Sequence, residues 1–233
     1  MLSRRALPSL NDLSRSVLRT GLAILSRQKR LDGLFLVDAT CGNGHDTLFL
    51  ADTLAGLGAR CPILAFDIQP EAIARSRQRL GPHGGGVIFY ERGHETLAEV
   101  LAEYAPKPRL AAVVYNLGFL PGSDRRVTTT AERSMASLAA AAAALAGGGL
   151  MSVHAYGGHP GGSEELEAAS DWFGALPAGQ WTTAGYALRN KEKNPETLFL
   201  AEKTADICFN PHPAPSAGRL RPDGWEPGGL PPP

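Results

Sequence analysis

LFLVDATCGNGHDT (residues 34–47) is the stretch that decides the fold. It begins as an apolar run, passes through two glycines two residues apart, and becomes helix-like in composition. Glycine lets the backbone turn sharply and lie close to a ligand, so this order is typical of nucleotide-binding α/β folds. A pair of glycines alone is a weak signal, but here the required strand and helix flank it. Thr47 replaces the third glycine of the dinucleotide fingerprint, which disfavours NAD.

The chain repeats this alternation of apolar runs and helical stretches. The runs are nearly continuous in Val, Ile, Leu and Phe, which is typical of strands buried on both faces of a parallel sheet. Strands are predicted at residues 34–40, 63–68, 87–91, 110–117 and 150–156. Helices are predicted at residues 9–27, 45–57, 71–80, 95–104, 130–145 and 164–173. The glycines at 147–149 are expected to end the helix before them.

The end of the chain departs from the alternation. Residues 181–189 and 197–202 are strand-like, and only a short basic loop separates them. No crossover helix fits into that loop, so the two strands must be antiparallel. The sequence therefore predicts an α/β fold, Rossmann-like, with a seven-stranded, mostly parallel sheet and an antiparallel last strand.

Composition limits the class of protein. The 233 residues contain 23 Lys and Arg against 23 Asp and Glu, which excludes a polybasic surface but not a local basic patch. No apolar run approaches the length of a membrane span, and the three scattered cysteines fit a reducing cytoplasm. We expect an N-terminal helical extension (1–30), one catalytic or binding domain (31–205) and a Pro/Gly-rich disordered tail (206–233).

Ligands of open α/β sheets bind beyond the carboxyl ends of the strands, so residues that directly follow strands are the candidates for a site. Asp67 follows the second strand, where a carboxylate can accept both hydroxyls of a ribose. The alternative is that Asp67 caps the next helix before Pro70. His94 follows the third strand, where it could cap a helix or contact a base edge.

The fourth strand ends in a Gly/Pro-rich loop that contains an amide and an aromatic ring. Asn116 could accept a hydrogen bond from an amine, and Tyr115 or Phe119 could stack on a base. The alternative is a turn built by Asn and Gly. We expect Asn116 and the backbone of Leu117 and Gly118 to position the reacting group.

The loop after the fifth strand is rich in Gly, His and Tyr, and Tyr156 and His159 are candidate substrate contacts. No carboxylate or Cys lies at ligand spacing from its histidines, so we expect no metal. Cations in the loops after the fourth and sixth strands suggest an anionic substrate, although a solvated hairpin turn is nearly as good an explanation. They are Arg125, Arg126, Arg189, Lys191 and Lys193.

Together these features resemble class I methyltransferases that use S-adenosylmethionine. A narrower set of segments resembles the YtqB-like family of putative rRNA methylases. The segments are DATCGNGHDT (38–47), FDIQPEAI (66–73), GHETL (93–97), YNLGFLPGSD (115–124), YGGHPGG (156–162) and NPETLFLAEK (194–203). The resemblance covers residues 9–203, and the basic N-terminal extension and the Pro-rich tail depart from the family core.

The resemblance implies a function. MnmM-type members of the family methylate the aminomethyl nitrogen of 5-aminomethyl-2-thiouridine at the tRNA wobble position. It implies S-adenosyl-L-methionine as cofactor, the tRNA anticodon arm as partner, and no membrane; a second copy of the chain is a further candidate partner. The implied cofactor-binding residues are Asn43, His45, Asp67, Gln69 and His94. Asp38, Gly42, Gly44, Asp46 and Thr47 around the glycine turn are expected to join them.

Methyl transfer needs a nitrogen with a lone pair, so an ammonium substrate must first lose a proton. The site could instead bind the neutral amine, or the proton could go to water or to a side chain such as Tyr115, Tyr156 or His159. The sequence does not identify a general base. Alternative functions are a methyltransferase acting on rRNA or a small molecule, and a non-catalytic nucleotide-binding module. An NAD oxidoreductase ranks third, because of Thr47.

Overall fold

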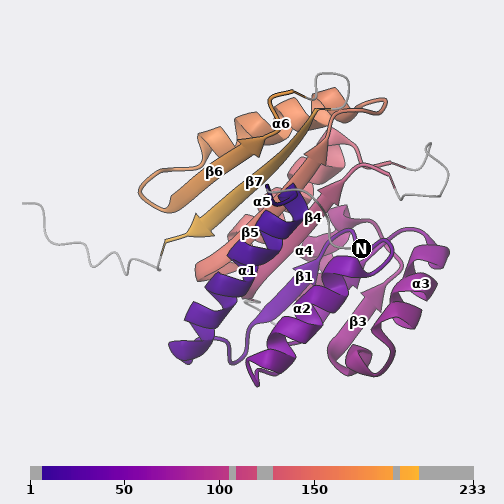
Figure 1. The fold of residues 1–233 in the computed structure, drawn as a ribbon, viewed down its shortest axis with the longest axis vertical. Helices are drawn as coiled ribbons and strands as arrows, with labels where there is room; N and C mark the ends of the chain where they lie inside the picture. The colour runs from indigo at the N-terminus through magenta and orange to yellow at the C-terminus, as the bar shows by residue number, and fades with distance from the viewer. Residues whose placement is uncertain (1–6, 105–108, 120–127, 191–194, 205–233) are drawn as a thin grey trace, which may run out of the picture.

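A computed structural model gives the fold of residues 7–104, 109–119, 128–190 and 195–204 (Figure 1). Strands and helices alternate as the sequence predicts. The strands are β1 (Phe35–Asp38), β2 (Ile63–Phe66), β3 (Val87–Tyr90), β4 (Leu110–Leu117), β5 (Leu145–Tyr156), β6 (Trp181–Ala187) and β7 (Glu196–Lys203). The α-helices are α1 (Leu10–Arg27), α2 (His45–Gly56), α3 (Pro70–Leu80), α4 (Leu97–Tyr104), α5 (Ala131–Ala144) and α6 (Gly162–Ala175). Short 3₁₀ turns at Gly81–Gly86 and His94–Thr96 precede β3 and α4.

The strands form one seven-stranded sheet in the order β3-β2-β1-β4-β5-β7-β6. Strands β1 to β5 are parallel, and β7 runs antiparallel to both β5 and β6. The predicted fold class, with its antiparallel last strand, is confirmed. Because the first five strands are parallel, their carboxyl ends meet at one edge of the sheet.

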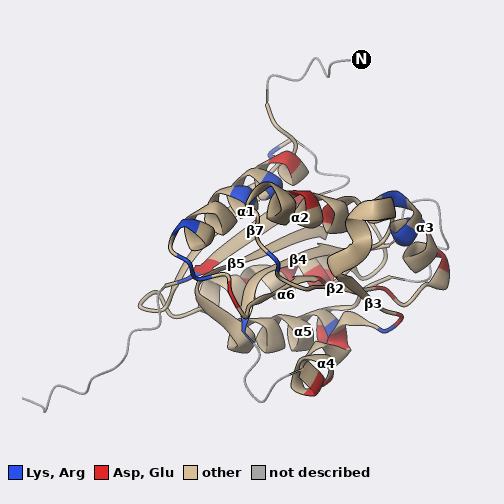
Figure 2. Cartoon of the chain, turned by 90° about the horizontal axis from the view of Figure 1, so that it is seen from below, with Lys and Arg blue, Asp and Glu red and all other residues tan. Residues whose placement is uncertain are grey.

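Helices α1, α2 and α3 lie on one face of the sheet, and α4, α5 and α6 lie on the other (Figure 2). Leucines of α1 and side chains of α2 pack with β1 and β4 on one face, and Ile73 of α3 packs beside Ala65 of β2. Helices α4, α5 and α6 pack on the other face around Leu97, Leu138 and Phe173. The apolar runs of the sequence therefore become strands enclosed between two helical layers.

The structure differs from the prediction in three strands. The glycines at 147–149 lie inside β5 rather than at a helix end. They form an irregularity in its pairing with β4, where Gly148 has a φ of 78°. The edge strand β3 is also less buried than expected, and β6 ends at Ala187, two residues before the predicted boundary.

Helix α1 packs directly on the sheet. Leu18, Leu22 and Leu25 are buried in the same apolar cluster as Leu36 of β1 and Leu50 of α2. The expected tail (206–233) lies outside the described residues. Within the described ranges, no helix is long and apolar enough to cross a membrane.

Candidate functional site

A cavity of about 700 Å³ opens at the carboxyl ends of the parallel strands. Its walls come from the segments that follow β1 to β5, from the first turns of α1, and from the start of β7. The structure therefore brings together candidates that are far apart in the sequence. The predicted residues that line the cavity are Gly42, Asn43, His45, Asp46, Asp67, Gln69, His94, Asn116, Gly118, Phe119, Tyr156 and His159.

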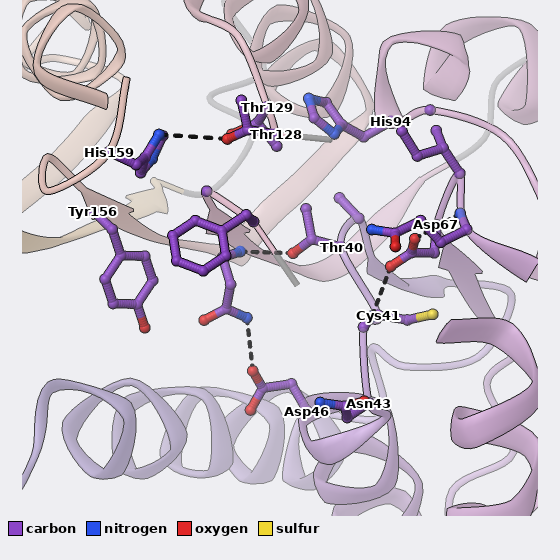
Figure 3. Close-up of a pocket in the computed structure, with 18 of the residues that line it drawn as sticks. Thr40, Cys41, Asn43, Asp46, Asp67, His94, Thr128, Thr129, Tyr156 and His159 are labelled. Atoms are coloured by element: carbon purple, nitrogen blue, oxygen red, sulfur yellow. Dashed lines mark hydrogen bonds between the residues drawn. The ribbon is translucent and has the colours of Figure 1, made fainter. Parts of the chain in front are cut away.

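Asp67 is held at the end of β2 by two backbone amides. Gly42 N donates to its Oδ2 at 2.9 Å (Figure 3). Gln69 N donates to its Oδ1 at 2.9 Å. Each oxygen keeps a lone pair for a further donor. Burial raises the pKa of Asp67 above its usual value, although backbone hydrogen bonds oppose this shift. The carboxylate is thus fixed in place and equipped to accept two hydroxyl groups.

Asn116, at the end of β4, is fixed through both its main chain and its side chain. Its backbone N donates to Thr40 Oγ1 at 2.7 Å, and its Nδ2 donates to Asp46 Oδ2 at 2.8 Å (Figure 3). The other oxygen of Asp46 accepts two hydrogen bonds from the guanidinium of Arg15, a residue of α1. A chain of polar contacts therefore runs from α1 through α2 to β4.

His94 forms part of the cavity wall and is only 6% exposed. Burial lowers the pKa of His94 to about 4, so its imidazole is neutral at physiological pH. Ser134 Oγ donates to the buried carboxylate of Glu165, so His94 Nε2, 3.2 Å from that hydroxyl, must be the donor to Ser134. Thr129, also in the wall, donates to Glu165 at 2.6 Å. This network joins His94 to the loop before α5.

Tyr156 and His159 form the wall near Phe119. The Tyr156 hydroxyl lies 3.0 Å from Nδ1 of His154, and burial raises the pKa of Tyr156 to about 12. His159 Nδ1 lies 3.0 Å from its neighbouring Pro160 carbonyl and 3.4 Å from Thr128 Oγ1. The imidazole of His159 meets the ring of Phe119 edge-on at 5.9 Å. Aromatic side chains thus surround this end of the cavity.

Three residues expected at the cofactor, Asp38, Gly44 and Thr47, lie beneath the glycine turn instead of in the cavity wall. Asp38 is fully buried and accepts a hydrogen bond from Thr47 Oγ1 at 2.6 Å. Burial, assisted by the nearby Asp46, raises the pKa of Asp38 to about 7. Gly44 is also buried, with a φ of 78°, and packs closely against Ser76. These three residues shape the turn rather than line the cavity.

Two of the expected catalytic residues face the core. The Tyr115 hydroxyl lies 2.8 Å from Ser137 Oγ, and its ring is fully buried. Leu117 is buried in the same apolar cluster. Successive residues of a strand point to opposite faces, so Tyr115 and Leu117 point away from the face that carries Asn116. The prediction that the Tyr115 side chain takes part in catalysis is corrected by this position.

Sequence reasoning missed several residues of the wall, among them Asn11, Arg15, Thr40, Thr128 and Thr129. Arg15 lies on an amphipathic helix, outside its apolar side. That position was the only sequence feature that could have suggested a role at the site. The expected substrate contacts Arg125, Arg126, Lys191 and Lys193 lie outside the described residues. Among the residues that are described, no group of three or more His, Cys, Asp or Glu side chains is arranged to hold a metal ion.

Comparison with known proteins identifies the family. The profile of the family described as "Putative rRNA methylase" matches residues 63–202, more than half of the chain. The chain belongs to this family. The resemblance drawn from the sequence motifs is thereby confirmed.

The relatives include a chloroplastic tRNA (mnm(5)s(2)U34)-methyltransferase of Arabidopsis thaliana. It is 33% identical over 175 residues, which cover 72% of this chain and 63% of the relative. The chain thus spans less than two thirds of that relative's length.

Two solved structures share the fold. A protein from Clostridium thermocellum, titled "putative rRNA-methylase", is 27% identical with a TM-score of 0.72, and the match covers 85% of this chain and 100% of that one. A "putative methyltransferase" from Streptococcus mutans, solved in complex with SAH, is 26% identical with a TM-score of 0.68. That match covers 84% of this chain and 99% of the other.

Proposed function

We propose that this chain is an S-adenosylmethionine-dependent methyltransferase that N-methylates the aminomethyl group of 5-aminomethyl-2-thiouridine at the tRNA wobble position. One observation carries the proposal. A single cavity holds Asp67, a carboxylate suited to ribose hydroxyls, and Asn116, an amide suited to an amine. The Arabidopsis relative, named for this tRNA position, and the SAH complex of the Streptococcus mutans relative support the choice of substrate and cofactor.

The residues present fit the cofactor. Asp67 would accept the two ribose hydroxyls, because two backbone amides already orient its carboxylate. Asn43, within the glycine turn, and His45, directly after it, line the cavity, as does Gln69, two residues after Asp67. His94, neutral and buried, would contact the adenine end of the cofactor. Because its imidazole is uncharged, this contact does not require a charged group to lose its water. When bound, the cofactor supplies a methyl group on an electrophilic sulfonium.

The chain's own contribution is to position a neutral amine for in-line attack. Asn116 would accept a hydrogen bond from an N–H of that amine, which leaves the nitrogen lone pair available. Tyr156 stays protonated near neutral pH because its pKa is raised to about 12, so it is a poor proton acceptor. His159 is the remaining candidate to take the proton of an ammonium substrate, because its imidazole lines the cavity beside Phe119.

The rim of the cavity suits a nucleic acid better than a small apolar substrate. Phe119 and Tyr156 offer rings on which a flipped-out base can stack. Arg92 and Arg133 also line the cavity, and their side chains are 49% and 56% exposed. We propose the cytoplasm as the compartment of this reaction, as the cysteine content indicates, while the Arabidopsis relative is named as chloroplastic.

Methyl transfer to purified RNA tests the proposal. The chain is incubated with S-adenosylmethionine labelled in its methyl group and with tRNA or rRNA from cells that lack this modification. We expect label in tRNA, and none when the tRNA lacks the 5-aminomethyl group. Label in rRNA alone would favour the rRNA alternative. Binding of S-adenosylhomocysteine without transfer to any RNA would favour a small-molecule substrate or a non-catalytic module.

A further inference from the structure

Helix α1 contributes directly to the cavity, although it lies outside the residues 63–202 that the family profile matches. A capping box between Ser9 and Asp12 starts the helix. Its buried side is attached to the sheet by a 2.6 Å hydrogen bond between Ser14 Oγ and Ser152 Oγ. Because both ends of this contact are buried, the first turns of α1 have a defined position above the carboxyl ends of β4 and β5.

Arg15, one residue after Ser14, reaches Asp46 at the start of α2. Its Nε and Nη2 donate to Asp46 Oδ1 at 2.9 and 2.7 Å. The two side chains are 31% and 16% exposed, so solvent screens this pair less than a surface ion pair. With Oδ1 occupied by the guanidinium, Asp46 Oδ2 is the oxygen that faces Asn116.

This arrangement determines which end of the Asn116 amide faces Asp46. A carboxylate paired with a guanidinium only accepts hydrogen bonds, so the NH₂ end of Asn116 must face Asp46 Oδ2, at 2.8 Å. The carbonyl oxygen then remains for the cavity. If the amide rotated by half a turn, two acceptors would face each other near Asp46 and a donor would face the substrate.

We propose that Arg15 and Asp46 are positioning residues that fix the orientation of the Asn116 amide and thereby select a substrate nitrogen that carries hydrogen. The inference rests on the proposed function. It assigns Asp46 to the orientation of Asn116, where the sequence prediction had assigned Asp46 to the cofactor. An amine or ammonium group can donate to the carbonyl oxygen of Asn116, whereas a carbonyl or a deprotonated ring nitrogen cannot.

The test compares Asp46→Asn, Arg15→Gln and the double variant with the wild type. We expect affinity for S-adenosylhomocysteine to change less than about twofold in each, while kcat at saturating cofactor falls by about 100-fold, as misplaced reacting groups do. If the two residues act as a unit, the double variant loses no more than Asp46→Asn alone. Arg15→Lys, which keeps one charged donor, should recover part of kcat.

Arg19→Gln is the matched control. Arg19 lies one turn further along α1, stacks over Phe49 and does not line the cavity. We expect this variant to keep wild-type kcat and cofactor affinity. A large loss of cofactor affinity in Asp46→Asn, with kcat unchanged at saturation, would overturn the proposal and return Asp46 to the cofactor. Additive losses from Arg15→Gln and Asp46→Asn would also overturn it.

A second measurement does not depend on turnover. The side-chain NH₂ resonance of Asn116 is assigned by its loss in Asn116→Asp and followed by NMR in the full chain. We expect a downfield proton typical of a hydrogen bond to a carboxylate, displaced upfield in both Asp46→Asn and Arg15→Gln. An unchanged resonance would contradict the inference even if the wild type methylates tRNA. If the resonance is displaced in both variants but the wild type does not methylate tRNA, the positioning contacts are supported and the proposed substrate is wrong.

Discussion

Asp67 is the residue that most directly tests how the cofactor is held. In Asp67→Asn the shape of the side chain is kept, but the charge that strengthens hydrogen bonds from ribose hydroxyls is lost. Charge-assisted bonds contribute about 1.5–3 kcal/mol, so we expect affinity for S-adenosylhomocysteine to fall about tenfold or more. Calorimetry measures this. Asp52→Asn, an exposed change on α2 at a pair with His83, is the control. Equal affinities in wild type and Asp67→Asn would place the ribose elsewhere.

Asp38 makes folding stability depend on pH. Burial raises the pKa of Asp38 to about 7, whereas the unfolded chain has the ordinary value near 3.8. Between these values the folded state binds more protons than the unfolded state. The free energy of unfolding therefore falls as pH rises, and the loss of stability is complete above pH 7.

Asp38→Asn removes this titration. The free energy of unfolding of Asp38→Asn minus that of the wild type should therefore be about 2–3 kcal/mol larger at pH 8 than at pH 5. Urea unfolding of both proteins at the two pH values measures the difference. A stability difference that is the same at pH 5 and pH 8 would mean that Asp38 is ionised in the folded protein throughout this range.

Neighbouring residues of β4 show what the sequence could not decide. Asn116 and Tyr115 both end an apolar run and both carry polar atoms, so both were plausible at the site. Strand alternation separates them, because Asn116 contacts Asp46 while Tyr115 contacts Ser137 of α5. Since both faces of β4 are buried, no pattern of polar residues indicated which face leads to the cavity.

At the scale of elements, the turn between β1 and α2 depends on Gly44. A Cβ at Gly44 would lie 2.8 Å from the Cα of Ser76, and the residue has a φ of 78°. Gly161, before α6, has the same φ but nothing within 4 Å of such a Cβ. The pair therefore separates the cost of the left-handed backbone from the cost of a clash with α3.

We expect Gly161→Ala to destabilise the protein by about 1–2 kcal/mol, from backbone conformation alone. Gly44→Ala should cost a further 1–3 kcal/mol or so, because the backbone of α3 must move. Chemical denaturation of the two variants measures both values. Equal losses would show that α2 and α3 adjust without cost, contrary to the close packing beneath the turn.

The alternation of strands and helices, including the final hairpin, was predictable because each element has its own periodicity and turn residues. The contribution of α1 to the site was not. Arg15 and Asp46 are 31 residues apart, and their contact exists only because buried leucines and Ser14 hold α1 against the sheet. Periodicity indicates that a helix has a buried side, but not which strand ends its first turn will cover.

At the scale of the whole molecule, the net charge is zero, so any attraction of RNA must come from local groups of Lys and Arg. Lys191 and Lys193, which lie outside the described residues, follow β6 in the sequence and belong to the predicted substrate-binding set. Each contact with a single-strand phosphate contributes a salt slope of about 0.7, so Lys191→Ala with Lys193→Ala should flatten the slope for tRNA affinity by about 1.4. Arg27→Ala with Arg60→Ala is the control, because Arg27 ends α1 and Arg60 precedes β2, at the opposite end of the sheet from the cavity. Identical slopes in wild type and the lysine variant would remove these lysines from the RNA interface.

The division of the chain into residues 1–30, 31–205 and 206–233 remains a prediction at this scale. Helix α1 shares its apolar cluster with β1 and α2, so the first boundary separates segments of sequence rather than separate bodies. The tail boundary lies outside the described residues.

We propose that one cavity brings a methyl donor to the aminomethyl nitrogen of a wobble uridine. Nucleoside mass spectrometry of tRNA tests it most directly, in cells that lack this chain and are complemented with wild type or with Asn116→Ala. We predict 5-methylaminomethyl-2-thiouridine with the wild type, and accumulation of 5-aminomethyl-2-thiouridine without the chain or with Asn116→Ala. An unchanged ratio of the two nucleosides in the absence of the chain would contradict the account.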